Sequence, residues 1–129
     1  MLVECMSLRN QNEAYEYQYL KIGSIYTVYG IFHDLNSNLN YLIAPEPDNV
    51  PFYVPSGLFK IRDGKIPNSF EAGTLIFPDG SSRIIIAYNN LFAYRHHKGL
   101  IEQDSKELKV FWREKEEIDK ELSRLGQDL

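Results

Sequence analysis

Histidine and cysteine are the side chains of this sequence best suited to acid–base, nucleophilic or metal chemistry, and it holds three histidines and one cysteine. His33 precedes Asp34, but neighbouring residues of a strand point to opposite faces, so this pair is not expected to converge. His96 and His97 lie in the basic run Arg95–Lys98, which favours a solvated loop. In a helix they would diverge by about 100°, so a metal site would need carboxylates from elsewhere. The sequence leaves their role open.

Cys5 lies in a predicted strand and has the character of a small buried hydrophobe, with no activating base indicated beside it. A single cysteine excludes an internal disulfide and a cysteine-based zinc site. The glycines form neither of the two common phosphate-binding loop motifs. The sequence therefore predicts no catalytic residue, no metal and no cofactor. It favours a binding protein over an enzyme, and a small enzyme is the least favoured alternative.

The charge balance is mildly acidic, with 14 basic and 18 acidic side chains, a net charge of -4 and a pI near 5.3. Nucleic-acid-binding proteins usually concentrate positive charge on one face, so a phosphate backbone is not expected as the main ligand. The acidity suits a basic protein partner, although it equally serves to keep a small protein in solution. No apolar run reaches the ~18 residues that span a bilayer, and no signal peptide is indicated, so a cytoplasmic location without membrane association is expected.

Short aromatic-rich strands separated by turn residues run from Tyr19 to Asp63, and this rhythm predicts a small, strongly bent antiparallel barrel. Residues 25–32 are apolar on both faces, which predicts one central strand covered on both sides. Pro51 and Pro55 bracket a short segment that is expected at a sheet edge, because proline removes a ladder donor. Further strands are predicted at residues 2–8, 39–44 and 58–61, with a hairpin at 75–77 and 83–88.

From residue 89 onward the pattern becomes helical. A short helix is expected over residues 91–95, ending before Gly99, and a long helix over 105–125. Asp104 and Glu107 have the spacing of a capping box, and Gly126 is placed for a C-terminal stop. One apolar stripe is expected to dock the long helix: Leu108, Phe111, Trp112, Ile118, Leu122 and Leu125.

Together these elements predict an α+β fold, a small bent antiparallel β-barrel with a long C-terminal amphipathic helix. The chain is expected to form one domain over residues 1–129. Residues 1–63 would supply the barrel-like part, and residues 64–129 the hairpin and C-terminal helices.

Tyrosine is unusually frequent, with nine residues beside seven phenylalanines. Tyrosine suits protein interfaces because it joins apolar area to a polar tip; small barrels are also rich in tyrosine because aromatic rings fit pleated surfaces. The sequence is equally compatible with both explanations for the frequent tyrosines. Glu16 and Gln18, interleaved with the tyrosines at 15, 17 and 19, count against single-stranded nucleic acid. Partly exposed positions are predicted at Tyr15, Tyr17, Tyr19, Tyr41, Tyr53 and Tyr94.

The segments 19–28, 40–43 and 53–61 together resemble the strand pattern of a widespread group of small bacterial and phage proteins with Src-homology-3-like barrels. The part from Pro67–Phe70 through Leu91 and Phe92 to the helix around Phe111 is similar to immunity proteins of bacterial polymorphic toxin systems.

The resemblance implies a cytoplasmic immunity protein that neutralises a cognate protein toxin, with a basic toxin matching the acidic surface. The alternative is a phage-type accessory or adaptor module that binds protein or nucleic acid through the barrel face. The oligomeric state stays open. Carboxylates would steer the partner and tyrosines would anchor it, which gives these expected partner-binding residues: Tyr15, Tyr17, Tyr19, Glu46, Asp48, Tyr53, Tyr94, Glu114, Glu116 and Glu121.

Overall fold

The computed structural model describes residues 1–10, 15–34 and 38–127. In chain order the described elements are β1 (Leu2–Cys5), β2 (Ile25–Thr27), β3 (Gly30–His33), β4 (Leu39–Ile43), β5 (Phe52–Pro55), the 3₁₀ helix η1 (Ser56–Leu58), β6 (Phe59–Asp63), β7 (Glu71–Ile76), β8 (Ser82–Ala87), the 3₁₀ helix η2 (Asn89–Phe92), α1 (Tyr94–Ile101) and α2 (Ser105–Arg124).

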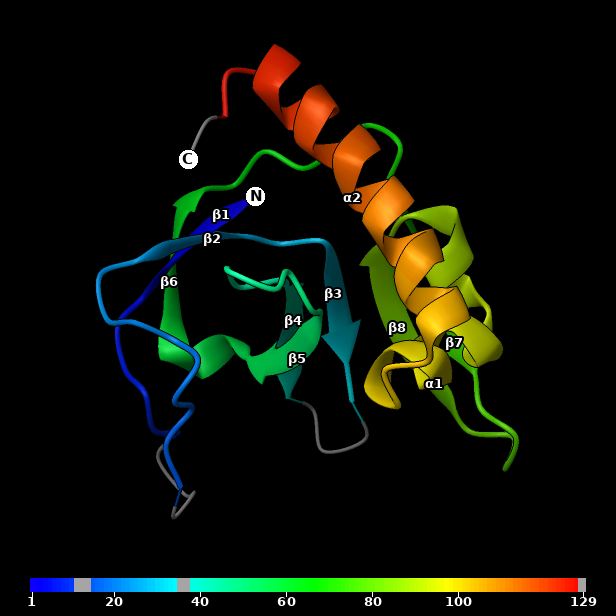
Figure 1. Ribbon diagram of the computed structural model, residues 1–129. Coiled ribbons are helices and arrows are strands. Elements are labelled where there is room, and N and C mark those ends of the chain that lie inside the picture. Colours follow the sequence, from blue (N-terminus) through cyan, green and yellow to red (C-terminus); the bar gives the residue numbers. More distant parts are fainter. Residues whose placement is uncertain (11–14, 35–37, 128–129) are drawn as a thin grey trace.

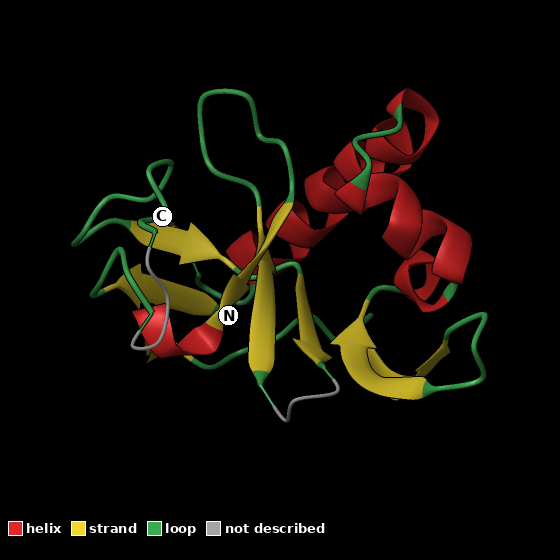
Figure 2. Ribbon diagram, turned by 90° about the horizontal axis from the view of Figure 1, so that it is seen from below, coloured by secondary structure: helices red, strands yellow, loops and turns green. Residues whose placement is uncertain are grey.

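The strands pair into two antiparallel sheets, one of order β2-β1-β6 and one of order β5-β4-β3-β8-β7. Both helices lie on one side of the five-stranded sheet, and the three-stranded sheet lies at the other end of the molecule (Figures 1 and 2). The α+β fold is therefore confirmed. Among the described residues the ladders form two separate sheets. The expected edge position of the segment between Pro51 and Pro55 is confirmed, since β5 ends the larger sheet.

Residues 25–32 do not form the single strand that the sequence predicts. They divide into β2 and β3, which belong to different sheets. The change of sheet occurs at Val28 and Tyr29, both buried. The Val28 amide donates to Met1 O at 2.9 Å and the Tyr29 amide donates to Leu42 O at 2.7 Å. Successive amides therefore bond to the N-terminal residue beside the smaller sheet and to β4 of the larger sheet, which makes this corner a joint between them.

Two apolar cores fill the spaces on either side of the larger sheet. In β4, Tyr41 and Ile43 point to one core, which also contains Val3 and Cys5 of β1; this is the inter-sheet core. Leu42, between them in sequence, points the other way into the core beneath the helices, the helix-side core. The strict alternation along β4 sends neighbouring residues to different cores. Tyr41, expected to be partly exposed, is only 7% exposed because it faces the inter-sheet core.

The helix α1 differs from the expectation. The predicted short helix ended before Gly99, but α1 continues through this residue to Ile101. Gly99 is buried where α1 meets α2, and a Cβ atom there would lie 2.8 Å from Glu107 Cβ and closer still to its Cγ. Glycine here therefore allows close helix packing rather than ending the helix. Because α1 is a helix packed on the sheet, His96 and His97 are buried, and the expected solvated loop is wrong.

The helix α2 begins and ends as the sequence predicts. The Asp104 side chain caps it by accepting a hydrogen bond from the Glu107 amide at 3.2 Å. Gly126 follows with a φ of 85°, and the Gln127 amide donates to Leu122 O at 2.9 Å. This is the glycine-ended geometry that satisfies the last helical carbonyls.

The stripe of α2 is confirmed at Phe111, Ile118 and Leu122, which are all buried in the helix-side core. Trp112 is the exception, because its side chain is 40% exposed. Consecutive helical residues point about 100° apart, so Trp112 cannot share the direction of Phe111. Its indole N–H instead donates to Asn49 O at 2.9 Å.

Replacement of Phe111 by alanine is expected to destabilise the protein by about 3–5 kcal/mol, because the ring is fully buried and stacks edge-on against Tyr29. The matched control is Glu117→Ala on the exposed face of α2, which should cost well under ~1 kcal/mol. Urea denaturation of both variants measures the difference. Small and equal effects would contradict the docking of α2 on the sheet.

Gly99→Ala should also destabilise the protein, although alanine is the better helix former by about 1 kcal/mol. The added methyl group would overlap Glu107, so a net loss of about 1–3 kcal/mol is expected. Gly64→Ala is the control, since a Cβ atom there would meet nothing within 4 Å. A Gly99→Ala variant as stable as the parent would refute close packing as the reason for this glycine.

Candidate functional site

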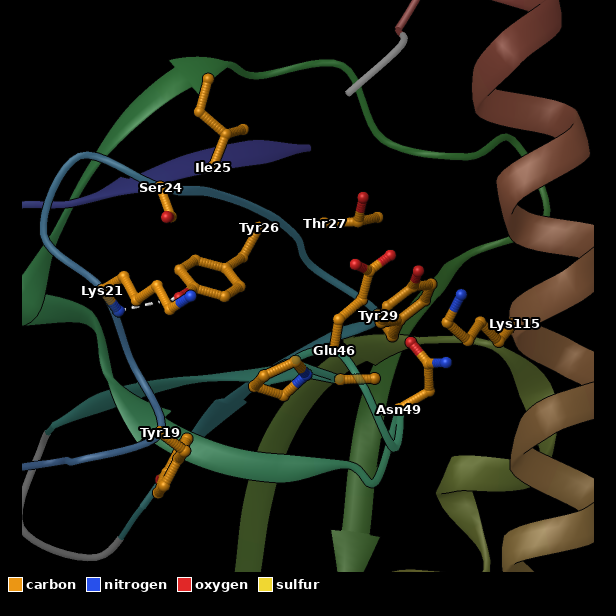
Figure 3. A pocket seen from close by; sticks show the side chains of 12 residues that line it. Tyr19, Lys21, Ser24, Ile25, Tyr26, Thr27, Tyr29, Glu46, Asn49 and Lys115 are labelled. Atoms are coloured by element: carbon orange, nitrogen blue, oxygen red, sulfur yellow. Dashed lines mark hydrogen bonds between the residues drawn. The ribbon is translucent and has the colours of Figure 1, made fainter.

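Two adjoining hollows lie against the 44–49 turn, and we call them together the groove. The first, of about 350 Å³, is lined by residues of the 19–29 segment, by the turn and by Lys115. Figure 3 shows Glu46, Tyr29, Asn49 and Lys115 close together at its right-hand end, with Tyr19 and Tyr26 further along it. The second, of about 360 Å³, lies between Asp48 and the α2 residues. Asn49 and Lys115 line both hollows.

The 44–49 turn that separates the hollows is held to α2. It contains a cis peptide bond between Glu46 and Pro47, and Asn49 has a φ of 54°, a left-handed conformation that asparagine tolerates better than most residues. The Asn49 amide donates to Pro45 O at 3.0 Å, and Asn49 O accepts a hydrogen bond from the Trp112 indole N–H. The hydrogen bond to α2 therefore fixes the backbone of the turn, and the Glu46 and Asp48 side chains of this turn are exposed.

A polar cluster at the floor of the groove joins α2 to the corner between β2 and β3. The Tyr29 hydroxyl donates to Asp119 Oδ1 at 2.7 Å, and Lys115 Nζ lies 2.8 Å from Asp119 Oδ2. The ammonium group is also 5.5 Å from the centre of the Tyr29 ring. Burial raises the pKa of Tyr29 well above its usual value, and the hydrogen bond to Asp119 raises it further. Tyr29 is therefore a neutral donor, and this cluster fixes the helix against the sheet.

A cluster of three tyrosines lies beside the groove, and Tyr19 of this cluster lines it. Residues 15–19 form no strand, but their tyrosine rings lie together. The Tyr15 and Tyr17 centroids are 5.3 Å apart, and those of Tyr17 and Tyr19 are 6.1 Å apart. Tyr19 stacks on Phe52 at 4.5 Å and 22°, and burial raises the pKa of Tyr19 to about 12, assisted by Tyr15. Tyr19 remains 37% exposed, so it presents a fixed aromatic edge to solvent.

The expected partner-binding residues fall into two groups. Four of them line the groove: Tyr19 and Glu46 in the first hollow, Asp48 and Glu116 in the second. The others lie elsewhere. Tyr15 joins the tyrosine cluster, Tyr17 lines a separate hollow, Tyr53 and Tyr94 pack against the helix-side core, Glu114 accepts from Asn90 and Glu121 accepts from the Asn68 amide and the Ser69 hydroxyl.

Sequence reasoning did not assign Trp112, Lys115, Asp119 or Asn49 to a site. One signal for Trp112 was present, because two adjacent aromatic residues of a helix cannot both face one core. Lys115 and Asp119 have the i, i+4 spacing of a helical ion pair, which is common on solvated faces. Their role at the groove depends on the 44–49 turn reaching α2, and the sequence does not encode that contact locally.

The two buried histidines form separate contacts. His96 Nε2 is 2.8 Å from the Tyr88 hydroxyl, and His96 Nδ1 is 2.9 Å from Glu107 Oε1. A histidine between a carboxylate and a hydroxyl resembles an acid–base relay. All three side chains are buried, however, and none of them lines the hollows described for the groove. This chain of contacts joins α1, α2 and the end of β8, and its geometry is that of a structural link.

His97 lies on the sheet side of α1. Its Nδ1 atom is 2.9 Å from the Tyr53 hydroxyl, and its ring stacks on Phe32 with centroids 5.0 Å apart. Burial lowers the pKa of His97 to about 4, with smaller contributions from His96 and Arg83. His97 is therefore neutral at pH 7.

Cys5 and His33 stand apart from these clusters. Cys5 is buried in the inter-sheet core, and burial raises the pKa of its thiol, so the thiolate needed for nucleophilic chemistry is disfavoured. His33 lies at the end of β3. Within the described ranges no group of three or more His, Cys, Asp or Glu side chains is arranged to hold a metal ion.

Comparison with known proteins gave no match to a family model, to a curated protein or to a solved structure. Helices long and apolar enough to span a bilayer are lacking in the described part of the chain.

The stability of the protein is expected to fall as the pH is lowered from about 6.5 to about 4. In this window His97 of the unfolded chain binds a proton that the folded protein excludes, so protonation favours unfolding. The loss should reach roughly 2–3 kcal/mol. Urea denaturation at pH 7.5, 6.0 and 5.0 measures it, with His97→Gln as the comparison. An unchanged pH dependence in His97→Gln would show that other groups cause the loss.

Proposed function

We propose that this protein is a non-enzymatic binding protein that holds a protein partner in the groove beside the 44–49 turn. The observation that carries the proposal is the convergence of acidic and aromatic side chains there. The residues lining the groove include four carboxylates (Glu46, Asp48, Glu116 and Asp119) and two lysines (Lys21 and Lys115). Asp119 is already paired with Lys115. Glu116 lies 3.4 Å from Lys120 Nζ in an exposed ion pair. Glu46 and Asp48 are exposed and favour a partner that is basic at this surface.

The aromatic side chains give the groove an anchoring surface. Tyr19 and Trp112 are 37% and 40% exposed, and each is held by a contact, Tyr19 by stacking on Phe52 and Trp112 by its hydrogen bond to Asn49. Fixed aromatic side chains lose little conformational entropy on binding, and tryptophan and tyrosine are enriched among residues that dominate binding energy. Tyr19 lines the first hollow and Trp112 lines the second, each beside exposed carboxylates, and aromatic rings combined with charged groups suit a protein–protein contact.

The biological class that we propose is a cytoplasmic immunity protein that occludes a cognate toxin, as the resemblance of the sequence implies. Such a partner requires nanomolar or tighter binding, about 12 kcal/mol or more. We also propose that β1 to β6 form the expected Src-homology-3-like barrel. Its support is that between β1 and β6 the chain passes from one sheet to the other twice, at the Val28–Tyr29 corner and through η1 between β5 and β6.

Charge reversal in the groove is expected to slow association with the partner. The partner is first sought by co-purification with the product of the neighbouring gene. Glu46→Lys combined with Asp48→Lys should then lower the association rate by about tenfold at low salt and less at high salt. The matched control is Glu71→Lys on the exposed edge strand β7, which should change the rate little. Equal rates for both variants would exclude the groove as the binding surface.

Trp112→Ala tests the anchoring surface separately. The partially exposed indole should be replaceable without unfolding, and its loss should raise the dissociation rate by an amount equivalent to about 2 kcal/mol or more. The same kinetic experiment measures this rate. If the product of the neighbouring gene did not bind the protein, and the purified protein retained oligonucleotides, these results would contradict the immunity function. They would favour the adaptor alternative.

A further inference from the structure

A further hollow, separate from the groove and of about 340 Å³, lies beneath α1 at one end of the five-stranded sheet. Its walls come from β3, β4, β5, β8 and α1, and no residue that lines it also lines the groove. Its volume is within the range of sites for small organic ligands. The protein-binding function proposed above does not use it.

Arg83 gives this hollow a positive charge that is only indirectly compensated. The residue is 9% exposed, and its Nη1 atom donates to Ser81 Oγ at 2.8 Å and to Ser82 O at 3.3 Å. Ser81 in turn donates to the Asp79 carboxylate. Among the described residues no carboxylate lies within 4.0 Å of the guanidinium and no acceptor takes a hydrogen bond from Nε or Nη2.

Among the described residues the buried side-chain nitrogen and oxygen atoms without a partner comprise Gln127 Oε1 alone, so the unpaired guanidinium donors of Arg83 are open to the hollow, where an anion can pair with them. The Arg83 group is also held in one orientation, because its Cζ atom lies 4.2 Å from the centre of the Phe77 ring. A fixed, planar fork of donors matches the two oxygens of a carboxylate.

The walls beside Arg83 are aromatic. The His97 ring lies parallel to Phe32, with centroids 5.0 Å apart and an interplanar angle of 18°. Tyr53 and Phe77 have centroids 5.1 and 5.5 Å from the same imidazole. The Tyr53 hydroxyl contacts His97 Nδ1, which fixes the imidazole, and His97 is neutral. Flat, uncharged ring surfaces of this kind suit an aromatic ligand.

Acceptor groups lie on another wall of the hollow. The Asp34 carboxylate accepts from Asn40 Nδ2 at 3.3 Å, and both side chains line the hollow. A carboxylate here disfavours a ligand with a second negative charge and favours one with a hydrogen-bond donor.

We propose that this hollow binds a small aromatic monocarboxylate, with Arg83 pairing with its carboxylate, the aromatic residues packing on its ring, and Asp34 accepting from a donor substituent on that ring. The full chain can be titrated with 4-hydroxybenzoate and with its neutral analogue 4-hydroxybenzamide, using calorimetry and chemical-shift mapping. The carboxylate should bind with shifts at Phe32, Phe77 and His97, and the amide should bind at least about tenfold more weakly.

Two variants test the assignment. Arg83→Gln should weaken the binding of 4-hydroxybenzoate at least about tenfold. Lys98→Gln, on α1 but outside the hollow, should leave the affinity unchanged. Ile101→Trp covers the case in which Arg83→Gln fails to fold. Ile101 is 60% exposed at the mouth, so a larger side chain there should block the ligand without unfolding the protein.

Several results would overturn the proposal. These are equal affinity for the acid and the amide, no effect of Ile101→Trp, and binding of inorganic phosphate as tight as that of 4-hydroxybenzoate. A peptide ending in phenylalanine that bound more tightly than N-acetylphenylalanine would assign the hollow to a protein terminus and overturn the small-molecule assignment.

Discussion

The two consecutive amides of Val28 and Tyr29 determine how the two sheets are joined. One donates to Met1 O and the other to Leu42 O, so the chain leaves one ladder and enters the other without an unpaired buried donor. Buried backbone groups must be satisfied, and here the change of sheet itself satisfies them. The corner also directs the Tyr29 side chain toward α2, where it donates to Asp119. The junction between the sheets and the docking of the long helix therefore share one residue.

The groove and the hollow under α1 are consequences of this arrangement. Both helices lie on one face of the larger sheet, and different elements cover the two ends of its strands (Figures 1 and 2). At one end the 44–49 turn reaches α2 through Asn49 and Trp112, which leaves the groove. At the other end α1 covers the sheet through His97 and Tyr53, which leaves the hollow beside Arg83. Each site is formed by residues distant in sequence, and in each a polar contact fixes an aromatic side chain.

Local patterns in the sequence predicted the fold class, the edge strand, the hairpin and the long helix with both of its ends. These features depend on alternation, proline, capping residues and glycine, which act over a few residues. The division of residues 25–32 between two sheets was not predictable in this way, because an apolar strand and an apolar corner have the same composition. Gly99 was misinterpreted for a similar reason: its role depends on Glu107 of the next helix. Of the candidate site, the exposed Tyr19, Glu46, Asp48 and Glu116 were predicted from residue type, whereas Trp112, Asn49 and Arg83 acquire their roles only through long-range contacts.

Trp112 is the only tryptophan in the sequence, and its hydrogen bond to the 44–49 turn gives the protein an internal optical reporter. Indole emission depends on solvent exposure and on hydrogen bonding at the ring nitrogen, and both change if a ligand covers the groove or displaces the turn. The hollow under α1 does not include this residue. Intrinsic fluorescence can therefore distinguish occupation of the groove from occupation of the hollow without any label.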